Sequence, residues 1–86
     1  MHELSLAMEV CRIAEERLGP EGAGRLRVVA LAVGHRAGIE PDNLEFCLEA
    51  LLAQPPFGQG RPQLARVPGE DLRIEYLEVD DASPED

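Results

Sequence analysis

Apolar residues recur through residues 3–18 with the spacing of an amphipathic helix. They fall at three- and four-residue intervals, and charged side chains such as Glu9 and Arg12 lie mostly on the opposite face. Gly19-Pro20 predicts the end of this helix, because glycine is a common left-handed cap and proline interrupts a helix. Residues 21–24 are then expected to form a loop. The apolar positions are Leu4, Leu6, Ala7, Met8, Val10, Cys11, Ile13, Ala14 and Leu18.

Residues 25–33 (RLRVVALAV) predict a strand that is apolar on both of its faces. Strict alternation places Arg27, Val29, Leu31 and Val33 on one face and Leu26, Val28, Ala30 and Ala32 on the other. Because the second face is rich in alanine, we expect one heavily packed face and one thinly covered face.

A second helix is predicted to begin near Pro41, since proline suits the first turn of a helix. Its apolar residues keep helical spacing, and Gln54-Pro55-Pro56 predicts its end. The proline- and glycine-rich stretch 55–62 reads as a loop. The helical apolar positions are Leu44, Cys47, Leu48, Leu51 and Leu52.

The last third of the chain resembles a hairpin, with strands over 63–67 and 72–79 and a turn at Pro68-Gly69. In the second strand, strict alternation would place Ile74 and Leu77 on opposite faces of the sheet. We expect a bulge near Glu75-Tyr76, because one extra residue would turn both apolar side chains inward.

These elements predict an α+β fold in the order α-β-α-β-β, with two helices packed on one face of a three-stranded mixed sheet. The chain has 86 residues, which suits one domain. We expect that domain over residues 1–80, followed by an acidic tail over 81–86.

The chain carries 8 Lys and Arg against 17 Asp and Glu, a net charge of −9. This balance argues against binding nucleic acid or an anionic membrane surface, which both require clustered basic residues. Residues 75–86 hold six acids and no base, which indicates a solvated end or, alternatively, an electrostatic handle for a basic partner. No apolar window is long enough to span a membrane. We expect a cytoplasmic protein.

No motif of an enzyme is present, so we expect no catalytic residues and no enzyme activity. Cys11 and Cys47 fall on apolar helix faces, where a thiol usually packs as a small hydrophobic group. A redox or metal-ligand role for either is the less favoured interpretation. His35, in the turn after the first strand, is interpreted as a polar loop residue rather than a ligand.

The N-terminus is the one place where the residues suggest metal chemistry. The Met1 amine, the amide and ring of His2 and the amide of Glu3 can close small chelate rings around one ion. Planar nitrogen donors suit Ni(II) or Cu(II). Taken alone, a histidine at position two is more commonly a frayed terminal residue.

The opening Met-His-Glu-Leu-Ser resembles the start of the HypA/HybF family of hydrogenase nickel-incorporation proteins. Val33-Gly34, the acid-Pro entry to the second helix and the Leu72-to-Val79 strand are also similar to that family's nickel-binding half. The resemblance implies a nickel metallochaperone that serves a nickel enzyme, with a [NiFe]-hydrogenase as the first expectation. It implies that Met1, His2 and Glu3 hold Ni(II), and that the partners are the enzyme precursor and a maturation GTPase.

One departure from the family pattern is large. Members carry a zinc domain with two C-x-x-C pairs before the last strand, where this chain has only Val67-Pro68-Gly69-Glu70. We therefore expect no structural zinc.

The alternative function is a metal-independent adaptor in a hydrogenase maturation complex, which could form a homodimer. Glu40 could assist the metal as a nearby acid, although a charge at the start of the second helix is the more common role.

Overall fold

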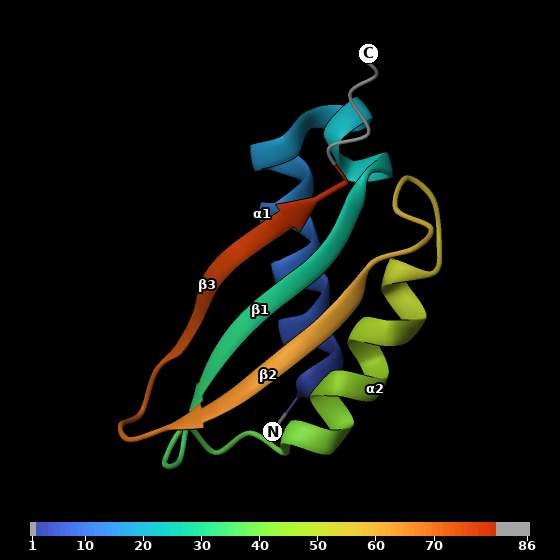
Figure 1. The fold of residues 1–86 in the computed structure, drawn as a ribbon. Coiled ribbons are helices and arrows are strands. Elements are labelled where there is room, and N and C mark those ends of the chain that lie inside the picture. Colours follow the sequence, from blue (N-terminus) through green and yellow to red (C-terminus); the bar gives the residue numbers. More distant parts are fainter. Residues whose placement is uncertain (1, 81–86) are drawn as a thin grey trace.

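The structure, a computed structural model, describes residues 2–80 and has the predicted order of elements (Figure 1). Two helices and a three-stranded mixed sheet confirm the α+β fold class. The elements are α1 (Glu3–Gly24), β1 (Leu26–Gly34), α2 (Pro41–Leu52), β2 (Arg61–Val67) and β3 (Leu72–Val79).

The sheet has the order β2-β1-β3, so the predicted hairpin is wrong. β1 pairs with β2 in parallel and with β3 antiparallel, and it separates the two strands that the sequence pattern had joined. The connection between β2 and β3 crosses the end of β1: the Gly34 amide donates to the Asp71 carbonyl at 2.8 Å and the Arg36 amide to the Gly69 carbonyl at 2.9 Å. β1 takes the centre because it is the strand with apolar residues on both faces.

The predicted faces of β1 need one correction, at its beginning. The pairing with β3 shifts between Leu26 and Val28, so Arg27 is an extra residue. This irregularity turns Leu26 to the same side as Val29, and both side chains are fully buried. Arg27, which alternation had placed on the packed face, is exposed.

The predicted bulge in β3 is confirmed. Ala30 pairs with Tyr76 and the next residue, Leu31, pairs with Ile74, so Glu75 is left without a partner in β1. As a result, both Ile74 and Leu77 pack against the core, while Tyr76 is exposed.

The first helix does turn at Gly19, as predicted, but residues 21–24 are helical rather than a loop. Gly19 has a φ of 74°, which breaks the regular helix, and the chain resumes a helical turn from Pro20 to Gly24. Proline is well suited to the first position of that new turn. Ala23 in this turn is fully buried, which explains why the segment stays ordered against the domain.

One core lies between the sheet and the two helices. It draws on α1, α2 and β1, which fixes both helices to the same face of the sheet. On the opposite face no helix of residues 2–80 covers β1. There the Tyr76 hydroxyl donates to Gln63 Oε1 at 3.0 Å, and both residues pair with Ala30. The core residues are Ala7, Val10, Cys11, Ala14, Leu26, Val29, Leu31, Val33, Leu44, Leu48 and Leu52. No helix in residues 2–80 is long and apolar enough to cross a membrane.

The close crossing at the end of β1 makes Gly34 intolerant of a side chain. A Cβ on Gly34 would lie 2.5 Å from the Gly69 carbonyl oxygen, so Gly34→Ala must displace backbone. We expect it to lower the free energy of unfolding by about 1–3 kcal/mol, measured by urea denaturation. Gly24→Ala is the control, because its Cβ would lie at an ordinary 3.6 Å from the nearest atom. Equal stability of the two variants would contradict this prediction.

Candidate metal centre

His2 lies immediately before α1 and is exposed to solvent. Its carbonyl oxygen accepts a hydrogen bond from the Leu6 amide at 3.2 Å, so the backbone of His2 already belongs to the helix start. The ring is therefore presented at the surface from a fixed backbone. Met1, whose amine is another predicted nitrogen donor, lies outside the described residues.

Glu3 is buried at the junction of the two helices, with only 4% of its surface exposed. Its Oε2 accepts the backbone N–H of Glu40 at 3.0 Å, and its Oε1 accepts the side-chain amide of Asn43 at 3.0 Å. Glu40 is the residue that precedes the first turn of α2. The carboxylate of Glu3 thus caps the start of α2 from another helix.

This contact explains the ionisation of Glu3. The hydrogen bond from the Glu40 amide is the largest influence and, with the Asn43 contact, holds the pKa of the Glu3 carboxyl below its usual value despite some desolvation. The positive end of the α2 dipole also favours a negative charge at this place. The carboxylate is consequently an anchor between α1 and α2, which leaves the amide of Glu3 as its predicted metal donor.

Sequence reasoning missed this anchor. The partners of Glu3 are 37 and 40 residues away, and no local pattern connects them. The only hint was an acid near the N-terminus with no local basic partner. Glu40 contacts Glu3 through its backbone amide; a role for its carboxylate in binding metal stays a prediction.

The remaining candidate residues do not gather around His2. Cys11 is buried in the core and Cys47 is half-buried. His35 is exposed at the end of β1, where Nη2 of Arg66 lies 3.3 Å from its Nδ1. Within residues 2–80, no three side chains of His, Cys, Asp or Glu are placed to hold one metal ion.

Burial raises the pKa of the Cys11 thiol to about 11, with a further contribution from the nearby charge of Glu15. The thiolate is the form that binds metals and attacks electrophiles, so Cys11 is inert near neutral pH. This agrees with its interpretation as a small hydrophobic group.

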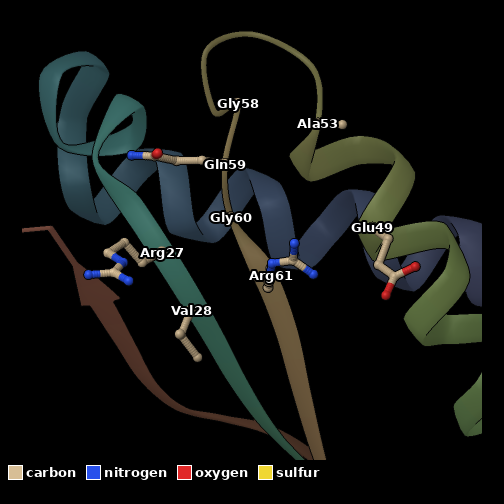
Figure 2. Close-up of a pocket in the computed structure, with 8 residues that line it drawn as sticks. All are labelled: Arg27, Val28, Glu49, Ala53, Gly58, Gln59, Gly60 and Arg61. Atoms are coloured by element: carbon tan, nitrogen blue, oxygen red, sulfur yellow. The ribbon is translucent and has the colours of Figure 1, made fainter.

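A surface hollow of about 690 Å³ lies far from His2, beside the loop that leads into β2 (Figure 2). Arg27 and Arg61 line it from neighbouring strands and Glu49 from α2. Figure 1 shows this loop at the end of the molecule opposite to the start of α1. The hollow carries both signs of charge and has no donors suited to a soft or borderline metal.

The fold is that of a small α+β domain, and the residues for which a metal site is predicted lie at the start of its first helix. Comparison with known proteins gives this class a family. Residues 1–70 match the family described as hydrogenase/urease nickel incorporation, metallochaperone, hypA. The chain belongs to this HypA family.

Individual relatives agree with the family. The chain is 44% identical over 50 residues to the hydrogenase maturation factor HypA of Chlorobium limicola, which covers 58% of this chain and 43% of the relative. It is 35% identical over 72 residues to the HypA of Chlorobaculum tepidum, covering 71% and 64%. The chain spans about half the length of the curated relatives it matches.

The fold has a solved counterpart. The solution structure of the Ni metallochaperone HypA from Helicobacter pylori superposes with a TM-score of 0.77, over 92% of this chain and 97% of that one. The sequence identity is 13%, so this likeness concerns the fold.

The Glu3 anchor predicts a pH-dependent loss of stability. The pKa of the Glu3 carboxyl is lower in the folded protein than in the unfolded chain, where it is about 4.3. The ionised carboxylate therefore stabilises the fold fully at pH values above the pKa of the unfolded chain. This stabilisation is lost as the pH falls through the pKa of the folded protein. We expect urea midpoints to fall more steeply below pH 5 in the wild type than in Glu3→Gln. Asn43→Ala should keep the direction of this dependence, because the Glu40 contact remains. Parallel curves for wild type and Glu3→Gln would contradict the anchor.

The two cysteines should differ in reactivity. In the folded protein at pH 8, we expect iodoacetamide to modify Cys47 much faster than Cys11, because Cys11 is buried and its pKa is raised. Mass spectrometry of tryptic peptides measures both rates. In concentrated urea the two rates should converge, and a fast reaction of Cys11 in the native state would show that the interpretation is wrong.

Proposed function

We propose that this protein is a nickel metallochaperone, which delivers Ni(II) during the maturation of a nickel enzyme, in the first instance a [NiFe]-hydrogenase. Support comes from membership of the HypA family and from the exposed His2 at the head of α1. The observation that carries the proposal is the buried Glu3 anchor, which holds the backbone beside His2 against α2.

In this proposal Ni(II) is bound by the Met1 amine, the ring and amide of His2 and the amide of Glu3. Such a set of nitrogen donors suits the planar geometry of Ni(II). The anchor contributes by pre-ordering the backbone that carries two of the donors, which reduces the entropy lost on binding. The His2 ring projects from the surface, where a second protein can approach the ion and exchange ligands with it.

The remaining parts of the proposal concern organisation and partners. We assign nickel binding to a single domain over residues 1–80, followed by an acidic tail over 81–86, which lies outside the described residues. Only four residues connect β2 and β3, which leaves no room for a zinc domain at this position. This supports the proposal that the chain holds no structural zinc there. The partners are the nickel-enzyme precursor and a maturation GTPase in the cytoplasm.

The test of the proposed site is a calorimetric titration of the untagged chain with Ni(II). We expect His2→Ala to weaken binding by at least about tenfold, because it removes the only side-chain donor. An N-terminal extension by two residues should weaken binding similarly, since it displaces the free amine. Binding should also weaken towards acidic pH, because imidazole and amine must lose their protons to coordinate.

His35→Ala is the matched control, since His35 is the other histidine and is also exposed. It should bind Ni(II) like the wild type. Equal affinity of wild type, His2→Ala and the extended chain would remove the N-terminal site.

A metal-independent adaptor is the second candidate function. The observation that favours it is the sheet face that neither described helix covers (Figure 1). On this face the alanines of β1 lie between β2 and β3. Nickel dependence separates the two functions: a partner that binds the nickel-free chain as tightly as the loaded chain favours the adaptor.

A further inference from the structure

β3 forms one edge of the sheet. In the strand order β2-β1-β3, no strand of residues 2–80 pairs with its outer side (Figure 1). An edge strand presents a row of backbone N–H and C=O groups to which another strand can hydrogen-bond. The other edge strand, β2, contains Pro62, which has no backbone N–H to donate. β3 contains no proline, so it is the edge better suited to accept a further strand.

The sequence of β3, LRIEYLEV, has the same pattern of burial when it is read in either direction. From each end towards the middle, a half-buried apolar residue is followed by an exposed charged residue, a second half-buried apolar residue and an exposed residue. The bulge at Glu75 produces this symmetry, because it places Ile74 and Leu77 on the same face of the sheet. Such a strand can pair antiparallel with a second copy of itself and keep every side chain on its matching face.

The symmetry also fixes the register of the pair. With the two-fold axis at the middle of β3, Ile74 lies opposite Leu77 of the second copy. Leu72 lies opposite Val79 of the second copy in the same register. These are the half-buried apolar positions of the strand, so the pairing continues the apolar side of the sheet from one chain to the next.

The charged residues of β3 are complementary in this register. Arg73 lies opposite Glu78 of the second copy, and the symmetry makes the same pair twice. Opposite charges directly across an antiparallel pair stabilise it, and like charges destabilise it. Within one chain, the Arg73 guanidinium lies 3.6 Å from the carboxylate of Glu75. Both side chains are exposed, so this contact is weak and leaves Arg73 able to turn to the second copy.

A groove of about 510 Å³ lies between α1 and β3. Its apolar lining includes Leu6, Val10 and Ile13 of α1 and Ile74 of β3. Leu6 and Ile13 are half-buried in the single chain. In the paired arrangement, Leu77 of the second copy lies across from Ile74 on the side that faces the helices. The pairing therefore brings further apolar surface beside the groove and removes part of it from water.

We propose that two copies of this chain pair antiparallel through the outer edges of β3 and join their two sheets into one continuous sheet. Backbone hydrogen bonds between the strands supply affinity, as in other cases of strand addition. The two Arg73–Glu78 pairs select the register and the partner, because only a second copy presents both charges in the matching order. The pairing requires no metal, so it stands apart from the proposed nickel function.

Sedimentation velocity of the metal-free chain over a range of concentrations tests this pairing. We expect a dimer whose population rises with concentration. Arg73→Glu places acidic side chains opposite each other at both symmetric positions, so the dissociation constant of the dimer should rise at least about tenfold. Glu78→Arg should have the same effect with two basic pairs. Arg66→Glu is the matched control: it makes the same change of charge at an exposed position of β2 and should dimerise like the wild type.

A mixing experiment tests the register itself. An equimolar mixture of the Arg73→Glu chain and the Glu78→Arg chain should recover the dimer, because opposite charges then face each other at both positions. The double variant Arg73→Glu/Glu78→Arg should dimerise for the same reason. A wild type that stays monomeric at all concentrations would overturn the proposal. Single variants that dimerise as well as the wild type, or a mixture that stays monomeric, would overturn it too.

Discussion

The buried carboxylate of Glu3 is the contact on which the organisation of this domain's N-terminal end depends. It joins the first turn of α1 to the backbone amide of Glu40 and the side chain of Asn43, and so fixes the starts of two helices that are far apart in sequence. A carboxylate suits this place because the orphan amides and the dipole at a helix N-terminus both favour negative charge. The cost of burying it is offset by two hydrogen bonds to its two oxygens.

The same contact relates structure to the proposed chemistry. A terminal amine and imidazole on a frayed end would have to be ordered by the metal itself. Here the residue next to His2 is held by the core of the domain, and the His2 carbonyl is bonded into the helix. In the proposed site, this order would favour binding of the metal, while the exposed ring would leave the ion open to a partner.

The central strand is the second constraint. β1 is apolar on both sides and buried along most of its length, so it pairs on both edges and determines where β2 and β3 lie. Two irregularities in its pairing with β3, at Arg27 and Glu75, adjust which side chains face the helices. They bring Leu26, Ile74 and Leu77 into contact with one core that simple alternation would have divided between two faces.

Local patterns in the sequence were sufficient to predict the order and type of the elements. Helical spacing predicted α1 and α2, and the change of face around Glu75 predicted its bulge. These features depend on residues that are close together in the sequence, so a local pattern is enough to predict them. The metal donors that the opening Met-His-Glu suggests stay a prediction. Strand order, the turn of Leu26 into the core and the capping of α2 by Glu3 were decided by the tertiary structure. Each of them depends on the pairing of groups far apart in the chain, which becomes favourable only once the helices and the sheet have packed together.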